Sequence, residues 1–411
     1  MWDQIRSNQR KSIILVVVMA FLLLAIGWFG GEGFYGPGGG TGGLIIAIIV
    51  WILLTLTSYF SGDSIFLSIS GARKIKREDH EVLWNVVEEM KIASGMPQMP
   101  AVYIVDDPTP NAFATGRSPD KASVAVTTGL LERLTRSELQ GVIAHEMGHI
   151  RNRDVLYMMM IGVMVGAIAL LADIGVRMLF YGGRGRRRTS SGGGQAQAIM
   201  MIVAIVLMIL APIIAQIVYF AISRKREYLA DASASQFTRY PEALASALEK
   251  ISGLIRKPSK DAEKVNRIIA PSYIINPTLA ARGSGEKANL FSTHPPTKER
   301  VRILRAMAGG AGFGDYDMAF RQVTGNPVGV IPFRSLKTAE KVEIKKPDEI
   351  PTEKHIDRVR QSTDAIWRLN KYTFIPCDCG TKLKVPPKLQ GQRIMCPHCG
   401  RKHDVTKGGA F

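Results

Sequence analysis

Apolar residues are concentrated in four long runs that are separated by polar stretches. Two runs lie near the N-terminus, at 12–30 and 44–60, and two lie in the middle of the chain, at 155–172 and 198–222. A helix rises about 1.5 Å per residue, so uncharged runs of this length can cross a hydrocarbon core of ~30 Å. The pattern therefore predicts an N-terminal pair of transmembrane helices and a later membrane hairpin.

Basic residues flank the N-terminal pair at its two outer ends. They are Arg6, Arg10 and Lys11 before the pair, and Arg73, Lys74, Lys76 and Arg77 after it. The Gly-rich connector at 30–42 contains neither Lys nor Arg. By the positive-inside rule, the N-terminus and the segment after Phe60 are expected in the cytoplasm.

Alternatives to this membrane topology stay open. The first run could be a secretory signal peptide, although its apolar core is long and no clear A-x-A site follows. The two later runs could be buried helices of a soluble core, but their length favours a membrane hairpin. If both cross fully, the arginine-rich loop at 184–188 lies on the side that the positive-inside rule disfavours. The sequence does not decide this point.

The polar stretches suggest a split globular domain that mixes helices and strands. Strand-like pieces occur at 101–105 and 122–127, and the sequence T-R-S-E predicts a helix that is capped by Thr135 with Glu138 reaching back. The expected organisation is a transmembrane pair at 1–61, a first globular part at 62–154, a membrane hairpin at 155–222, a second globular part at 223–335, a charged linker at 336–371 in which a short helix around Ile366 and Trp367 fits, and a cysteine-rich module at 372–411.

The capped helix carries an H-E-x-x-H sequence. His145 and His149 are four residues apart, so their imidazoles project from nearly the same angle and can share one ion. A zinc ion held by two imidazoles and one further ligand keeps an open position, where a bound water can reach a pKa of about 7. Glu146 would take the proton of that water and pass it to the leaving amine. Chance occurrence on a solvated helix is the alternative.

The third ligand is sought downstream, because no third histidine follows at the spacing of the extended motif. The sequence E-Y-L-A-D puts Glu227 and Asp231 one helical turn apart. Glu227 would complete a site of two histidines and one carboxylate, and Asp231 would orient an imidazole. Taken alone, Glu227 is more often a solvated charge. Both ligand segments lie within roughly 10 Å of a predicted membrane helix, so the site is expected at the membrane face.

Four short sequences, in this order, carry a resemblance to a known family: NAFATG, HEMGHIRNRD, EYLAD and HPPTKER. With two apolar runs before the zinc helix and two after it, residues 2–308 resemble the HtpX-type membrane zinc metalloproteases, relatives of the CAAX prenyl endoproteases. The resemblance implies a mainly α integral membrane protein with a gluzincin-like α+β metalloprotease domain, one catalytic zinc, and cleavage of misfolded or damaged membrane proteins from the cytoplasmic side of the plasma membrane.

The resemblance also assigns residues to roles. It gives His145, His149 and Glu227 as zinc ligands, Glu146 as the general base and Asp231 as the carboxylate behind a ligand. Asn111, Ala112 and Phe113 resemble the sheet edge on which an extended substrate pairs. His294 resembles a histidine close to the site, which would stabilise the oxyanion or occupy the open zinc position. A turn at a helix start, anchored by Arg300, explains His294 equally well.

All four cysteines lie in the C-terminal module. Cys377, Cys379, Cys396 and Cys399 form C-x-C-x16-C-x2-C, which is typical of a closed structural zinc site in a zinc ribbon. The first pair is one residue shorter than the usual C-x2-C. Nucleic-acid contact, substrate capture, self-regulation and structural capping all stay open as its role, with capping the simplest.

The formal net charge of +18 could suggest a nucleic-acid partner, but anionic lipid headgroups explain it more simply in a chain with this much membrane segment. The partners expected are therefore the lipid bilayer and unfolded or membrane polypeptides, with the oligomeric state unspecified. Two other functions stay open, a prenyl-protein endoprotease and a non-proteolytic zinc-binding membrane adaptor. The presence of Glu146 favours an enzyme, because a purely structural site needs no general base.

Overall fold

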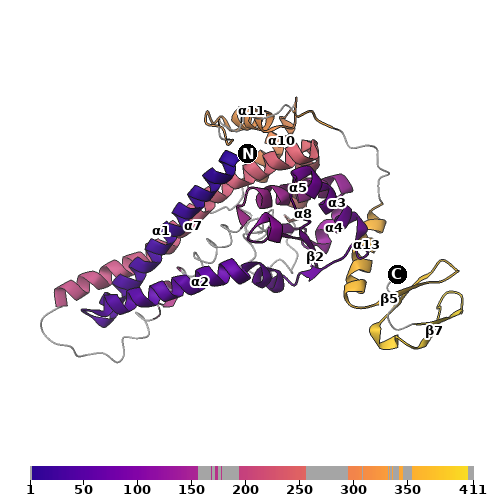
Figure 1. The fold of residues 1–411 in the computed structure, drawn as a ribbon, viewed down its shortest axis with the longest axis horizontal. Helices are drawn as coiled ribbons and strands as arrows, with labels where there is room; N and C mark the ends of the chain where they lie inside the picture. The colour runs from indigo at the N-terminus through magenta and orange to yellow at the C-terminus, as the bar shows by residue number, and fades with distance from the viewer. Residues whose placement is uncertain are drawn as a thin grey trace.

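The computed structural model describes residues 2–155, 194–255, 295–307, 309–331, 342–345 and 354–405, together with Ile168, 172–174, Arg177, Phe333 and Leu336. A long arm and a globular part make up these residues (Figure 1). The arm is built from α1 (Trp2–Tyr35), α2 (Gly39–Ile69) and α7 (Gly194–Thr238). Three segments in it are long and apolar enough to cross a membrane, Val16–Tyr35, Gly39–Ile69 and Ala198–Ala215. Most of the predicted run at 155–172 lies outside the described residues.

The Gly-rich connector at 30–42 is mostly helical. Only residues 36–38 separate α1 from α2, and the Glu32 carboxylate accepts hydrogen bonds from the backbone N–H groups of Gly38 and Gly40, each at 3.2 Å. The glycines allow the two helix backbones to touch. A Cβ on Gly43 would collide with the carbonyl oxygen of Gly27. Close packing of small residues between membrane helices thus outweighs the low helix propensity of glycine.

Replacing Gly43 with alanine should destabilise the arm, whereas the same change at Gly42 should not. A Cβ on Gly42 meets nothing within 4 Å. The overpacked Gly43→Ala variant is expected to lose about 1–3 kcal/mol, because the helices must separate. Thermal unfolding of both variants in one detergent measures the difference. Equal midpoints for the two variants would show that the helices are not pressed together at this point.

The globular part contains a four-stranded sheet with one edge strand packed against the helix that carries the H-E-x-x-H sequence. Its strands are β1 (Arg73–Lys74), β2 (Ala101–Val105), β3 (Ala112–Thr115) and β4 (Ser123–Thr127), in the order β1-β2-β4-β3. The pair β2/β4 is parallel, and β1/β2 and β3/β4 are antiparallel. The strand predictions at 101–105 and 122–127 are confirmed. Between these two strands in the sequence lie β3, which is an edge strand of the sheet, and a 3-10 turn at Pro119–Lys121.

The H-E-x-x-H sequence lies on α5 (Arg136–Arg151), which is buried among other helices of the globular part. The other helices are α3 (Glu81–Ser94), α4 (Thr128–Arg133), α8 (Pro241–Ile255), α10 (Thr297–Arg305) and α11 (Phe313–Thr324). The predicted capping box at the start of α5 is confirmed, with the Thr135 N–H donating to Glu138 at 2.8 Å. Small residues let neighbouring helices approach α5, since a Cβ on Gly141 would lie 2.7 Å from the Leu244 nitrogen of α8.

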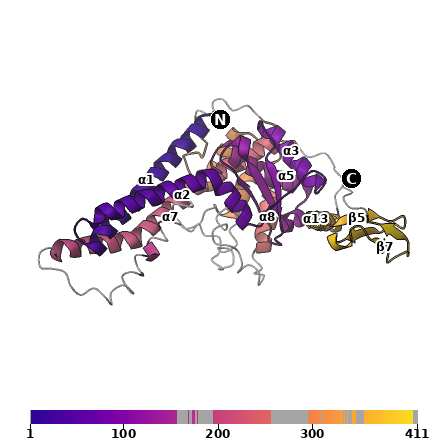
Figure 2. The same ribbon diagram turned by 60° about the horizontal axis from the view of Figure 1, so that its bottom comes forward.

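The interval 336–371, expected to be a charged linker with a short helix around Ile366 and Trp367, contains a packed helix, α13 (His355–Leu369), that includes both residues. Its Ala365 is fully buried in the core of the globular part, and Arg358 donates to the Glu132 carbonyl of α4 at 3.2 Å. Two small hairpins follow, β5 (Thr373–Pro376) with β6 (Lys382–Val385), and β7 (Arg393–Met395) with β8 (Lys402–Asp404), with a 3-10 turn at Pro387–Leu389. They lie at the opposite end of the molecule from the arm (Figure 2).

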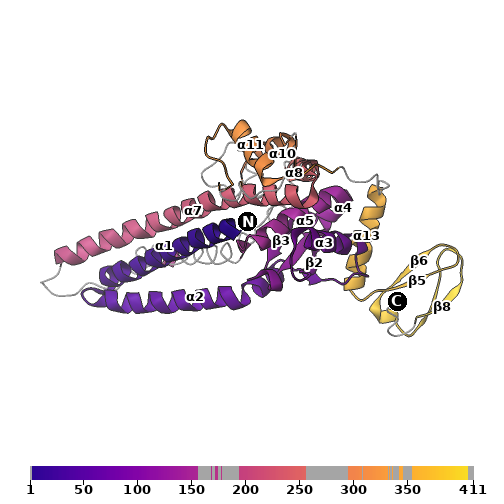
Figure 3. The same ribbon diagram turned by 45° about the horizontal axis from the view of Figure 1, so that its top comes forward.

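Helix α7 continues from the arm into the globular part. Figure 3 shows α7 running from the far end of the arm into the helices around α5. Glu227 lies about 18 Å along α7 beyond Ala215, at ~1.5 Å per residue. The membrane segment and the E-Y-L-A-D sequence are therefore two parts of a single rod.

Candidate metal centre

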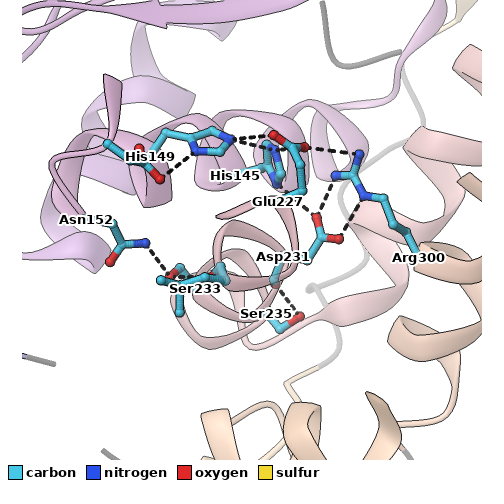
Figure 4. A network of polar contacts seen from close by, with 10 residues as sticks. His145, His149, Asn152, Glu227, Asp231, Ser233, Ser235 and Arg300 are labelled. Atoms are coloured by element: carbon cyan, nitrogen blue, oxygen red, sulfur yellow. Dashed lines mark hydrogen bonds and ion pairs between the residues drawn. The ribbon is translucent and has the colours of Figure 1, made fainter. Parts of the chain in front are cut away.

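Helices α5 and α7 bring the three predicted ligands together (Figure 4). The ligand atoms of His145, His149 and Glu227 all lie within 4.8 Å of one another. The two Nε2 atoms are 3.1 Å apart, and each is 3.5 Å from an oxygen of the Glu227 carboxylate. His145 and Glu227 are buried. The triangle therefore consists of two imidazole nitrogens and one carboxylate edge.

The size of this triangle fits a zinc ion. Zinc binds imidazole and carboxylate at about 2.0–2.2 Å in tetrahedral geometry, which separates its ligand atoms by roughly 3.3 Å. The donor set is also a usual one for a catalytic zinc, because three protein ligands leave a fourth position open. We therefore take zinc as the ion that these residues suit best.

A carboxylate orients each imidazole through its other nitrogen. The Nδ1 atom of His145 is 2.9 Å from Asp231, as expected, and Nδ1 of His149 is 3.2 Å from Asp154. Both carboxylates are fully buried. Such partners fix the tautomer so that Nε2 is free to bind a metal, and the role of Asp154 was not predicted from the sequence. Its position in HEMGHIRNRD, just beyond the end of α5, was the available signal.

Asp154 reaches His149 because the chain reverses at the end of α5. Arg153 has a φ of 54°, in the left-handed region, and the backbone N–H of Asp154 donates to the His149 carbonyl at 3.3 Å. This turn folds the carboxylate back onto the last turn of the helix. A residue five positions after a ligand thereby becomes its neighbour.

Arg300 of α10 contacts two carboxylates of the site, in addition to any role at the start of its helix. It is 1% exposed, and its guanidinium donates to both oxygens of Asp231, from Nε at 2.8 Å and from Nη2 at 2.7 Å. Its Nη1 is also 3.5 Å from Glu227. Arg300 thus contacts one zinc ligand directly and holds the carboxylate that orients another.

Carboxylates set the electrostatics of the centre. Burial lowers the pKa of His149, but the charges of Asp154, Glu227 and Glu146 outweigh burial and raise that pKa to about 10. Burial raises the pKa of Asp231, yet the Arg300 guanidinium and the bond to His145 leave that pKa below its usual value. The excess of ionised carboxylates therefore stabilises positive charge at the two imidazoles, whether a proton or a bound dication carries it.

The remaining predicted site residues lie beside the triangle or cannot be placed. Glu146 follows His145 on α5 and is 5% exposed. Asn111, Ala112 and Phe113 are buried where β3 begins, and β3 packs against α5. His294 lies outside the described residues.

The four cysteines form a second cluster. Their Sγ atoms lie within 4.8 Å of one another, with Cys377 to Cys399 at 3.5 Å and Cys379 to Cys396 at 3.7 Å. Tetrahedral zinc–sulfur bonds of about 2.3 Å separate sulfurs by roughly 3.8 Å, so the cluster suits a structural zinc. The Nε2 atom of His403 lies 3.2 Å from the Cys377 sulfur, where it can donate to the thiolate.

Comparison with known proteins relates the chain to a family of peptidases. The model of peptidase family M48 matches residues 77–308. A protease HtpX homolog of Dictyoglomus turgidum is 44% identical over 306 residues, covering 74% of this chain and 94% of that protein. One from Listeria monocytogenes is 42% identical over 313 residues, covering 75% and 100%. A solved structure, Ste24p of S. mikatae, is similar with a TM-score of 0.39 and 15% identity, covering 74% of this chain and 67% of that one.

Proposed function

Because the chain belongs to peptidase family M48 and is a membrane-bound metalloprotease, we propose that it is a zinc endopeptidase that cleaves misfolded or damaged membrane proteins on the cytoplasmic side. One observation carries the proposal. The ligand atoms of His145, His149 and Glu227 form a triangle of zinc size, and Glu146 follows His145 on α5 and raises the pKa of His149 through its charge. Such a constellation suits hydrolysis of a peptide bond.

Each residue of the site has a role in this reaction. A zinc ion bound by the triangle would act as a Lewis acid and make water nucleophilic near neutral pH. Glu146 accepts the proton of the attacking water and gives it to the leaving amine. Asp231 and Asp154 keep both imidazoles in the orientation that binds metal, and Arg300 keeps Asp231 ionised.

The edge strand β3 offers main-chain groups for an extended substrate. Residues of an antiparallel strand alternately face the partner strand and the free edge. The N–H of Thr127 donates to the Asn111 carbonyl at 2.9 Å, so Asn111 and Phe113 face β4. The N–H and C=O groups of Ala112 and Ala114 therefore point away from β4. Ala112 is completely buried and Ala114 is partly exposed, so a substrate strand would pair with the groups of Ala114.

Ala114→Pro should weaken cleavage without breaking the sheet. Proline removes an N–H that faces the free edge, a position where strands tolerate it. Losing one substrate hydrogen bond of about 1–1.5 kcal/mol predicts a roughly tenfold lower kcat/KM for an extended peptide. Ala114→Ser, which keeps the N–H, is the matched control. Equal kcat/KM for the two variants would exclude pairing at Ala114.

Substrate choice tests the proposed function. Purified zinc-loaded protein in detergent should cleave an unfolded polypeptide, stop when a chelator is added, and resume when zinc is restored. A short prenylated peptide should stay intact. Cleavage of that peptide alone would establish a prenyl-protein endoprotease, and cleavage of neither substrate would favour the non-proteolytic adaptor.

The orientation and location are part of the proposal. The N-terminus of α1 lies at the same end of the arm as the globular part, which agrees with basic residues on both outer flanks of the helix pair (Figure 1). The positive-inside rule then favours a multi-pass protein of the plasma membrane with its catalytic part in the cytoplasm. The C-terminal module would be a zinc ribbon in the same reducing compartment.

A further inference from the structure

A small basic hollow lies between the end of the zinc helix and the end of β3. It is shallow and partly open to solvent, and it is lined by Gly116, Arg117, Ser118, Ile150, Arg153 and Val155. Arg117 is half-buried and Arg153 is exposed. Among the described residues, neither guanidinium has an ion-pair partner. Two positive charges therefore flank one opening that also carries a serine.

The length of α2 places this hollow at the membrane boundary. Counted from Gly39, about 20 residues span a ~30 Å hydrocarbon core, which ends the lipid-exposed part near Tyr59 and Phe60. Further along α2, Leu67 is buried and the Phe66 ring contacts Phe113 of β3 at 5.1 Å, so that part belongs to the globular domain. Aromatic residues such as Tyr59 are common at the level of lipid headgroups.

Arg117 is fixed at this level by those aromatic rings. Its Cζ lies 5.5 Å from the ring centre of Tyr59 and 5.8 Å from that of Phe60. Cation–π contact with the two rings orders the guanidinium. Arg117 thus joins α2 at the boundary to the loop that follows β3.

Arg153 occupies a backbone position at which glycine would cost less. It follows the end of α5 with a φ of 54°, and left-handed backbone is unfavourable for a long side chain. Favourable interaction with the helix dipole can offset part of this cost. The dipole of α5 would stabilise any cation at position 153. Among the residues that line the same hollow, Arg117 is the second arginine.

We propose that Arg117 and Arg153 bind the phosphate group of an anionic membrane lipid next to the catalytic centre. Guanidinium groups suit phosphate oxygens, and the Ser118 hydroxyl adds a further donor at the same hollow. The inference rests on the membrane attachment of the proposed function. Since Asp154 follows Arg153 directly, a lipid held here would brace the turn that carries the carboxylate behind His149.

Lipid competition tests this site independently of proteolysis. The full-length Glu146→Gln protein, which cannot digest itself, is placed in neutral detergent with fluorescent phosphatidylglycerol. Unlabelled phosphatidylglycerol should displace the probe at a much lower mole fraction than phosphatidylcholine. Each basic residue near a lipid surface contributes about fivefold, so Arg117→Gln with Arg153→Gln should weaken phosphatidylglycerol binding roughly 25-fold.

Arg239→Gln is the matched control. Arg239 also follows a helix end with a φ of 54°, but at the end of α7 within the globular part. We expect its lipid binding to stay within about twofold of the parent protein, because that charge lies away from the predicted headgroup level. Arg153→Gly is a second variant, since it removes the charge and relieves the backbone strain, so that weaker lipid binding in a protein of equal or higher stability supports the site.

Three outcomes would overturn the proposal. The double variant could keep its preference for phosphatidylglycerol, or Arg239→Gln could lose as much binding, which would leave only a general effect of net charge. Inorganic phosphate could displace the probe as effectively as the lipid does, which would make free phosphate the ligand. The lipid assay measures binding and not cleavage. Its outcome therefore neither supports nor contradicts the proposed protease activity, which the cleavage assays test separately.

Discussion

The Glu146→Gln variant is expected to retain its zinc and to cleave an unfolded polypeptide about 10²–10⁴ times more slowly than the wild type. Glutamine has nearly the shape of glutamate but cannot accept a proton from the attacking water. Glu146 is buried on α5 beside His145, so an isosteric change should leave the packing intact. The measurement is kcat together with the zinc content of the purified variant.

Glu138→Gln provides a control on the same helix. Glu138 is equally buried, but it caps α5 and binds Lys250 and Ser246 instead of facing the metal centre. We expect a lower thermal midpoint with little change in kcat, the reverse of the Glu146 result. If Glu146→Gln cuts as fast as the wild type, the activity belongs to a contaminant or to a different base.

Arg300→Met should weaken both the fold and the metal centre. The Asp231 carboxylate is completely buried, and Arg300 binds both of its oxygens. Leaving that charge unpaired should cost about 3–5 kcal/mol of the free energy of unfolding. Because Asp231 orients His145, zinc affinity should also fall by about 10–100-fold. Thermal unfolding and competition with a zinc chelator measure the two effects.

Two further variants separate stability from metal binding. Arg300→Lys keeps the charge but loses the two-pronged contact with Asp231, so its zinc affinity should lie between those of the wild type and Arg300→Met. Combining Arg300→Met with Asp231→Asn removes the unpaired charge and should recover part of the stability without recovering zinc affinity. Zinc binding that is unchanged in Arg300→Met would reduce Arg300 to a packing role.

The residues nearest the metal were predictable because local patterns specify them. His145, Glu146 and His149 follow from helical spacing, and Glu227 and Asp231 from a second helical turn. Asp154 and Arg300 carry no such spacing. Asp154 depends on a left-handed turn at Arg153, and Arg300 depends on how α10 packs against α7, so both are properties of the tertiary structure.

Two features of the fold depend on tertiary contacts that the sequence pattern does not display. Glycine disfavours helices in water, but most of the Gly-rich connector at 30–42 is helical, because contact between α1 and α2 requires residues without side chains at this place. The mixed charges of 336–371 suggested a linker with only a short helix around Ile366 and Trp367. The helix α13 is longer, because Ala365 and Ser362 are buried and Ile366 and Leu369 pack against the core of the globular part.

The continuity of α7 connects the metal centre to the membrane part of the chain. Glu227 lies on the same 45-residue helix as the candidate span Ala198–Ala215. A shift of this helix along its axis therefore moves the third ligand relative to His145 and His149 on α5. The depth of the candidate span and the geometry of the three ligands are thus physically connected.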